Sequence, residues 1–192
     1  MPYIKRMEIN GFKTFGFKTT LTFERGFTVI TGPNGSGKTN IIDAVLFCLG
    51  ELSAKRLRSE NFSNLIFNGG SSSSVRKNEA KVVIQFDNSD GRIPVETSTV
   101  TISREIDRNG ESIYRINGRK VPRNHLLEVL SVAGISSYGH NIVLQGTLTR
   151  MAEISPQERR KIIEDMLGIA QYDAEKAEAE SKLKEADVAI KT

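Results

Sequence analysis

The fold is decided by one short stretch, Gly32-Pro33-Asn34-Gly35-Ser36-Gly37-Lys38-Thr39, which matches the pattern G-x-x-x-x-G-K-[ST]. The glycines at positions 35 and 37 let the backbone curl, so that successive N–H groups face inward toward phosphate oxygens. The Lys38 ammonium reaches the β- and γ-phosphates of a nucleotide, and the Thr39 hydroxyl binds Mg²⁺. The pattern therefore predicts a phosphate-binding loop rather than a chance glycine-rich turn.

The residues on either side of this loop provide the context that it needs. Phe27–Thr31 is a β-branched run, and it predicts a strand that ends at the loop. Lys38–Leu49 is strongly apolar and predicts a helix that is buried on most sides, with Gly50 as its C′ residue. The positive end of this helix points at the loop and favours an anion there.

Further out, the sequence predicts antiparallel β-structure on both sides of the loop and its helix. Two alternating runs, Tyr3–Asn10 and Lys18–Phe23, flank a turn with a glycine at each end, Gly11 to Gly16. The second half repeats this pattern around two Asn-Gly turns, at Asp107–Gly110 and at Asn117-Gly118. The expected elements of that half are strands over residues 82–86, 100–106, 112–117 and 141–144, and a helix over residues 122–131.

The last part of the chain differs in kind from the rest. Ser155-Pro156-Gln157-Glu158 combines an N-cap serine, a proline at N1 and a glutamate at N3, which is typical of a helix start. The residues that follow approximate a seam with a spacing of 3.5 positions, although Asp173 and Lys176 interrupt its apolar character, which is typical of a coiled coil that is only beginning. The sequence thus predicts two regions, a globular lobe over residues 1–154 and the start of a coiled-coil arm over residues 155–192.

Composition excludes several classes of protein. No apolar run is long enough to span a bilayer, and the charged start does not fit a signal peptide. Cys48 is the single cysteine, so there is no internal disulfide framework, and a reducing cytoplasm is expected. His125 and His140 have no Cys or second His at ligand spacing, so no metal site of that kind is expected.

The sequence contains only part of what ATP hydrolysis requires. Hydrolysis needs an acid that secures the metal and a group that orients water. No β-branched strand ends in Asp-Glu, and the nearest match, Ile162 to Asp165, lies inside the predicted tail helix. Gln145 follows the last predicted strand, where a Gln can reach Mg²⁺ and the attacking water, although a Gln there is usually only a polar loop residue. The chain therefore reads as half of an active site.

Several blocks together resemble the N-terminal head segment of SMC (structural maintenance of chromosomes) proteins of the prokaryotic type. They occur in the family's order and cover nearly the whole chain: residues 11–15, 32–44, 52–58, 64–67, 114–119, 141–146 and 155–160. Asn64 departs from the pattern, because many relatives have Asp at this position. The resemblance implies an α/β fold, namely the P-loop lobe of an ABC-type ATPase head with antiparallel β-structure, followed by a long helix that starts a coiled coil.

The resemblance also implies roles for individual residues. Lys38 and Gln145 would be catalytic, and Thr39 and Gln145 would hold the metal. Lys13 and Thr14 would lie near the α-phosphate and ribose, and Arg58 matches an arginine near ATP that is linked to DNA-stimulated activity. The residues expected to bind ATP and Mg²⁺ are Lys13, Thr14, Gly32, Pro33, Asn34, Gly35, Ser36, Gly37, Lys38, Thr39, Asn40, Arg58, Phe67 and Asn68.

The function implied is that of a chromosome ATPase, in which ATP binding drives head–head engagement and hydrolysis drives DNA organisation, condensation and segregation. The expected partners are the C-terminal half of the same head with its signature motif and Asp-Glu pair, a second SMC copy, a kleisin subunit and double-stranded DNA. The expected location is the cytoplasm, on the nucleoid and away from membranes. The alternatives are a coiled-coil repair ATPase of the RecN or double-strand-break type and a free-standing P-loop kinase or GTPase.

Basic residues leave one question open at this stage. They form either a DNA-contacting face, with contacts to phosphates that depend strongly on salt, or an ordinary solvated surface with scattered counter-charges. The residues concerned are Lys55, Arg56, Arg58, Arg76, Lys77, Arg115, Arg119, Lys120 and Arg123.

Overall fold

The computed structural model describes residues 2–69, 76–136, 142–143 and 160. The helices and strands with described bounds all belong to one compact unit. In chain order they are β1 (Tyr3–Asn10), β2 (Thr19–Thr22), α1 (Lys38–Cys48), the 3₁₀ turn η1 (Ser63–Leu65), β3 (Glu79–Asp87), β4 (Thr99–Asp107), β5 (Ser112–Ile116), β6 (Arg119–Val121) and α2 (Arg123–Val132).

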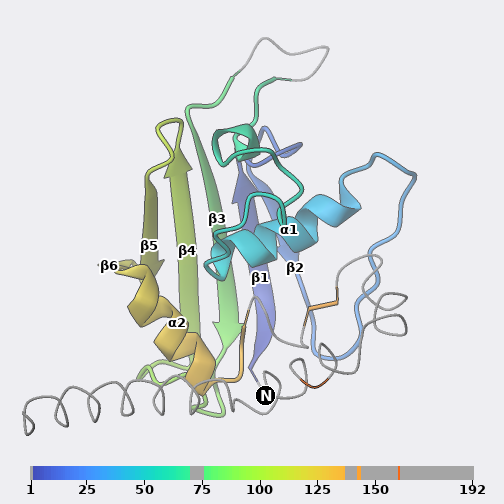
Figure 1. Ribbon diagram of the computed structural model, residues 1–192. Helices are drawn as coiled ribbons and strands as arrows, with labels where there is room; N and C mark the ends of the chain where they lie inside the picture. Colours follow the sequence, from blue (N-terminus) through green and yellow to red (C-terminus); the bar gives the residue numbers. More distant parts are fainter. Residues whose placement is uncertain (1, 70–75, 137–141, 144–159, 161–192) are drawn as a thin grey trace, which may run out of the picture. The chain divides into compact units, whose positions relative to one another are not determined.

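Six strands form one antiparallel sheet in the order β2-β1-β3-β4-β5-β6. The alternation that predicts the strands also sets their register: Met7 lies opposite Ile84, and Ile84 lies opposite Ile102. These three side chains are buried on one face of the sheet. Both helices cover that face (Figure 1), with α1 packed on β3 and β4 and α2 packed on β5.

Helix α1 forms as the sequence predicts. Ala44, Leu46, Phe47 and Cys48 are buried, whereas Ile42 is 37% exposed, and the end of the helix is closed by the backbone. The Gly50 N–H donates to the Phe47 carbonyl at 3.2 Å, and the Glu51 N–H donates to the Leu46 carbonyl at 3.1 Å. Gly50 has a φ of 91°, as this type of helix end requires at C′. Gly50 is therefore confirmed as the stop of the helix.

Most other predicted elements are confirmed, with shifts of a few residues at their ends. The two Asn-Gly turns lie where they are expected, between β4 and β5 and between β5 and β6. At the second turn Asn117 and Gly118 have φ values of 48° and 79°, the left-handed pair typical of a two-residue hairpin. The 3₁₀ turn η1 is an addition that the sequence patterns did not predict, whereas β6 is the strand that follows the predicted turn at Asn117-Gly118.

The predicted strand over Phe27–Thr31 is wrong. These residues form no strand, because no segment in the described part of the chain pairs with their backbone. Phe27 is 93% exposed and Val29 is 63% exposed. In Figure 1 this extended segment leaves the end of β2 and runs outside the sheet to the start of α1.

The predicted strand over residues 141–144 and the predicted tail helix fall mostly or wholly outside the described residues. The boundary at residue 154 also lies outside them, so the division into a lobe and a coiled-coil arm stays a prediction. Among the described helices, none has the length and apolar character that a membrane crossing needs.

Candidate functional site

The loop before α1 has the curled backbone that its sequence predicts. Gly35 and Gly37 have φ values of 81° and 89°, in the left-handed region that favours glycine. The Ser36 N–H donates to the Pro33 carbonyl at 3.3 Å, which closes the loop on itself. Helix α1 begins directly afterwards, and neither a side-chain cap nor an acidic residue occupies its first turn. The positive end of the helix is therefore left to an external anion.

Lys38 folds back over this loop. Its Nζ donates to the Gly32 carbonyl at 2.8 Å and to the Pro33 carbonyl at 2.7 Å, and both bonds are exposed to solvent. The ammonium group thus lies at the mouth of the loop, beside the start of the helix. Thr39 is the next residue of α1, so its hydroxyl also belongs to this end of the helix.

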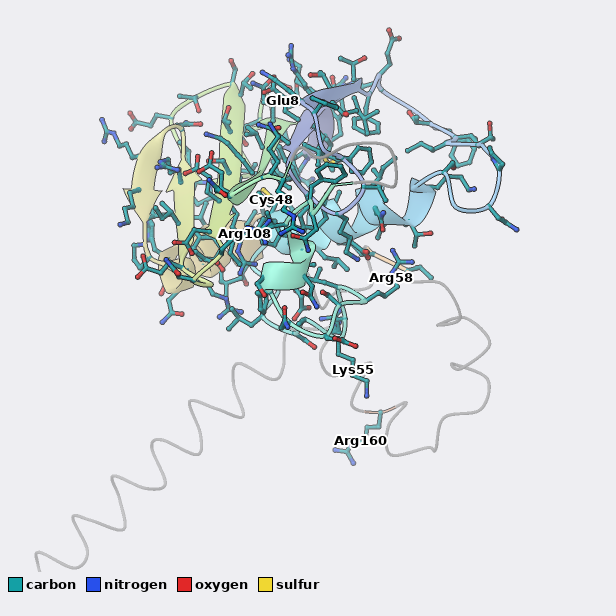
Figure 2. All side chains as sticks on the ribbon, turned by 90° about the horizontal axis from the view of Figure 1, so that it is seen from above. Glu8, Cys48, Lys55, Arg58, Arg108 and Arg160 are labelled. Carbon is teal, nitrogen blue, oxygen red and sulfur yellow. The ribbon has the colours of Figure 1, made fainter. Side chains whose placement is uncertain are left out.

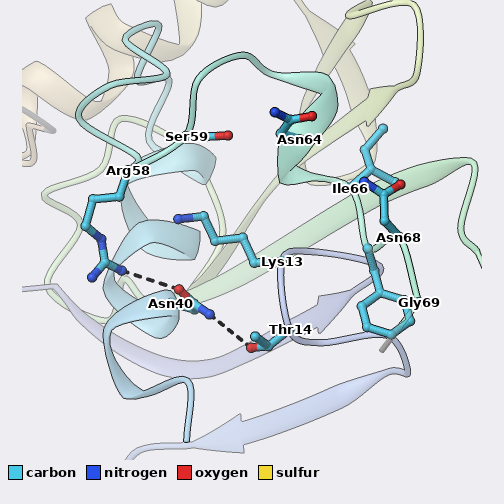
Figure 3. Close-up of a pocket in the computed structure, with 10 residues that line it drawn as sticks. Lys13, Thr14, Asn40, Arg58, Ser59, Asn64, Ile66, Asn68 and Gly69 are labelled. Atoms are coloured by element: carbon cyan, nitrogen blue, oxygen red, sulfur yellow. Dashed lines mark hydrogen bonds between the residues drawn. The ribbon is translucent and has the colours of Figure 1, made fainter. Parts of the chain in front are cut away.

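An open hollow of about 610 Å³ lies beside the loop and the first turn of α1 (Figure 3). It brings together six of the residues that the sequence assigns to ATP: Lys13, Thr14, Asn40, Arg58, Phe67 and Asn68. Four further residues complete its lining, Ser59, Asn64, Ile66 and Gly69. Cations and amides share this hollow with an apolar ring, the combination that a polar ligand with a flat ring system requires.

A chain of side-chain hydrogen bonds connects the hollow to the loop. The Asn40 Nδ2 donates to the Thr14 Oγ1 at 3.0 Å, and the Arg58 Nη2 donates to the Asn40 Oδ1 at 3.3 Å (Figure 3). A Cβ atom at Gly37 would lie 2.9 Å from the Thr14 Oγ1. Three separate segments of the chain therefore meet at the start of α1.

Backbone pairing places the first of these segments. The Lys13 N–H donates to the Leu65 carbonyl at 2.7 Å, and the Phe67 N–H donates to the Gly11 carbonyl at 2.8 Å. An isolated bridge joins Phe12 and Ile66 between them. The turn that follows β1 is thereby held against residues 65–67, so that Lys13 and Phe67 both reach the hollow.

Asp43 is a part of this region that the sequence analysis missed. Its carboxylate accepts a hydrogen bond from the Arg58 Nη2 at 2.6 Å and another from the Lys13 Nζ. Lys13 and Arg58 are also two of the three non-glycine residues with positive φ in the described chain. The signal in the sequence is an aspartate within the apolar run of α1, between Ile42 and Ala44.

Arg104 on β4 was missed as well, and it holds the far end of α1. Its Nη1 donates to the carbonyls of Phe47 at 3.0 Å and Glu51 at 2.7 Å, and its guanidinium stacks 4.3 Å from the Phe47 ring centre. Burial lowers the pKa of this guanidinium, which nevertheless stays charged at neutral pH. The one signal of Arg104 in the sequence is a charge at a position that the alternation of the strand assigns to the buried face.

The predicted basic face is divided by the structure. Several of its members have acidic or backbone partners: Arg56 pairs with Glu51, Arg58 with Asp43, Arg115 with Glu105, and Arg123 with the Gly50 carbonyl. Such pairing supports the alternative of scattered counter-charges for these four residues, and DNA contact stays a prediction.

Two further expectations concern cysteine and metal. Cys48 is buried, and desolvation raises the pKa of its thiol to about 12, so the thiol stays protonated and unreactive at neutral pH. Within the described residues there is no group of His, Cys, Asp and Glu side chains that could hold a metal ion. Gln145, the expected second metal ligand, lies outside the described residues.

Comparison with known proteins places the chain in a family. Residues 3–139 match the family described as the RecF/RecN/SMC N terminal domain. The chain is 46% identical over 188 residues to the chromosome partition protein Smc of Pyrococcus furiosus and 41% identical over 190 residues to that of Aquifex aeolicus. These matches cover 97% and 98% of the chain, which spans 16% of the length of each relative.

Solved structures agree with the sequence relatives. The Smc head domain of Pyrococcus furiosus with an extended coiled coil, bound to the C-terminal domain of ScpA, is 46% identical with a TM-score of 0.83; the match covers 97% of this chain and 47% of that one. A chain from a study of ATP-driven dimerization and DNA-stimulated activation of SMC ATPases is 45% identical with a TM-score of 0.80, over 85% of this chain and 99% of that one.

These likenesses confirm the predicted fold class, the P-loop lobe of an ABC-type ATPase head. RecF structures are 20% identical with TM-scores near 0.5, and they share only the fold. The chain therefore belongs to the RecF/RecN/SMC N-terminal domain family, as a segment of an SMC-type head.

Proposed function

We propose that this chain is the ATP-binding half of an SMC head, and that it hydrolyses ATP only together with a C-terminal half. The observation that carries the proposal is the curled loop with Lys38 at its mouth, next to an uncapped helix end and a hollow lined by Lys13 and Arg58. The chemistry of these donors fits a nucleotide triphosphate, because cations and free N–H groups gather on one side of α1.

In this proposal the chain's own residues bind and orient the nucleotide. The loop amides and the Lys38 ammonium hold the β- and γ-phosphates, which requires Lys38 to exchange its two carbonyl partners for phosphate oxygens. The Thr39 hydroxyl and the Gln145 side chain would hold Mg²⁺, which would neutralise charge on the phosphates. Phe67 and Asn68 border the base, and Thr14 and Lys13 face the α-phosphate and ribose.

The exposed segment before the loop supports the half-head reading. Phe27, Val29 and Ile30 are large apolar residues that lie exposed, and no strand in the described part of the chain pairs with them. A β-branched run of this kind is stable as a strand only when a neighbouring strand supplies hydrogen bonds and covers its side chains. We infer that a strand of the C-terminal half pairs here and orders the approach to the loop.

The partners follow from the relatives. The solved SMC heads include ones bound to ScpA and ones that dimerise with ATP and are activated by DNA. We infer for the complete protein a second SMC copy, a kleisin-type subunit, non-specific double-stranded DNA, and a role on the chromosome in condensation and segregation.

The test is reconstitution of hydrolysis from two halves. The 192-residue chain alone is expected to bind ATP–Mg²⁺ and to release almost no phosphate, whereas addition of the C-terminal half of the same head restores turnover. Lys38→Ala is expected to abolish both binding and the restored turnover. Vigorous hydrolysis by the pure chain would contradict the half-site proposal, and so would a reconstituted head that is indifferent to Lys38→Ala.

A further inference from the structure

We propose that Asp43 is a positioning residue for nucleotide binding: its buried carboxylate fixes the Lys13 and Arg58 cations at the wall of the hollow. This inference rests on the proposed function, because it assumes that the hollow receives part of the nucleotide. Asp43 does not line the hollow itself, so it acts through the two cations.

The geometry around Asp43 is that of a shared anchor. Its side chain is 2% exposed, and the Lys13 and Arg58 side chains above it are 11% and 45% exposed. Both cations bind the same oxygen, Oδ2. The Lys13 Nζ also donates to the Leu57 carbonyl, next to Arg58 in the sequence, so the two basic segments are tied together at this point.

Two features require such an anchor. Lys13 and Arg58 converge on one point, and two cations so close repel each other unless a carboxylate lies between them. Their backbones also adopt φ values of 49° and 51°, which non-glycine residues keep only where their surroundings hold them. A single carboxylate, Asp43, meets both requirements, and it lies on the helix that carries Lys38 and Thr39.

The charges around Asp43 leave a net positive charge that can attract the ligand. Two cations against one carboxylate leave a net positive charge, and Arg58, which is nearly half exposed, carries it toward the hollow. Arg58 also donates to Asn40 in the first turn of α1. A phosphate or ribose oxygen in the hollow would therefore meet a cation already fixed in direction, which lowers the ordering cost of binding.

The experiment is a double-mutant cycle on ATP–Mg²⁺ affinity of the 192-residue chain, measured by titration calorimetry. Asp43→Asn is expected to raise the Kd about tenfold. Arg58→Gln should also raise the Kd. In the Arg58→Gln background, Asp43→Asn should raise the Kd by less than about threefold, because Asp43 then has only Lys13 left to position. Fully additive effects would overturn the proposal, and so would a folded Asp43→Asn chain with wild-type affinity.

Two controls separate the possible failures. Glu105→Gln is the matched control, since Glu105 is also shared by two cations, Lys81 and Arg115, on β-strands outside the hollow; its Kd is expected to stay within twofold of the wild type. Lys38→Ala tests the proposed function separately: if Lys38→Ala leaves ATP binding intact, the proposed function fails first. If Asp43→Asn does not fold by circular dichroism, Asp43→Glu enters the same cycle, and additivity with Arg58→Gln is again the refuting result.

Discussion

Replacing Arg104 by methionine should destabilise the fold far more than an average substitution. Arg104 is 1% exposed and contacts the end of α1, where Cys48, labelled in Figure 2, is also buried. Methionine keeps much of the apolar stem but removes every donor. The guanidinium connects β4 to the C-terminal end of α1. Its loss therefore weakens the attachment of this helix, and the candidate phosphate loop precedes the helix at its N-terminal end.

The magnitude follows from the partners that are left behind. A hydrogen bond to a charged group contributes about 1.5–3 kcal/mol, and Arg104 donates to two backbone carbonyls, at 2.7 Å and 3.0 Å. The Phe47 carbonyl keeps its bond from the Gly50 N–H, which reduces the loss. Relief of the buried charge offsets part of the remainder. The expected decrease in the free energy of unfolding is therefore about 3 kcal/mol.

The assay is urea unfolding followed by far-ultraviolet circular dichroism, since the chain has no tryptophan to report by fluorescence. Arg115→Met is the matched control on the neighbouring strand, where the arginine is 29% exposed and pairs with Glu105. Its expected cost is below about 1 kcal/mol. If both variants lose the same free energy, Arg104 is not the tie between β4 and α1 that its contacts indicate.

Further substitutions test the phosphate loop and an ion pair on the sheet. Gly37→Ala and Gly35→Ala should each lower the free energy of unfolding by about 1–2 kcal/mol, because alanine is strained in the left-handed region. Gly37→Ala should lose more, since only its Cβ would contact Thr14, at 2.9 Å; equal losses in thermal unfolding would contradict this. Glu8→Gln should destabilise the chain by less than about 1 kcal/mol at pH 7. The hydrogen bond from Lys18 is the main cause that lowers the pKa of Glu8 from its ordinary value. The contribution is therefore present above the unfolded-state pKa and should be lost as the pH falls through the lowered folded-state pKa; a difference between the two proteins that is unchanged down to pH 2 would refute it.

Local patterns in the sequence were sufficient for most of the fold. The strand β1 has the predicted bounds, because alternation with a period of two reports directly which face of a strand is buried. The end of α1 at Gly50 was also predictable from local sequence, because the left-handed conformation at C′ favours glycine. The strand predicted over residues 27–31 failed because a strand also needs a partner, and no local pattern states whether one is present.

The candidate site likewise has a part that local sequence predicts and a part that it does not. Its phosphate loop is contiguous in sequence, so a single pattern found it. The hollow joins residues from separate segments, and only a family resemblance associated Lys13 and Arg58 with the loop before their geometry was known. Asp43 and Arg104 were missed because their roles lie in contacts with distant segments, and a lone charge in an apolar run does not name its partner.

The most direct measurement of the central claim is a crystal structure of the chain with ATP–Mg²⁺ or a non-hydrolysable analogue. The triphosphate is expected within hydrogen-bonding distance of the amides of residues 34–39, with the Lys38 ammonium moved from the Gly32 and Pro33 carbonyls onto phosphate oxygens. A triphosphate bound elsewhere, with Lys38 still on those two carbonyls, would contradict the account.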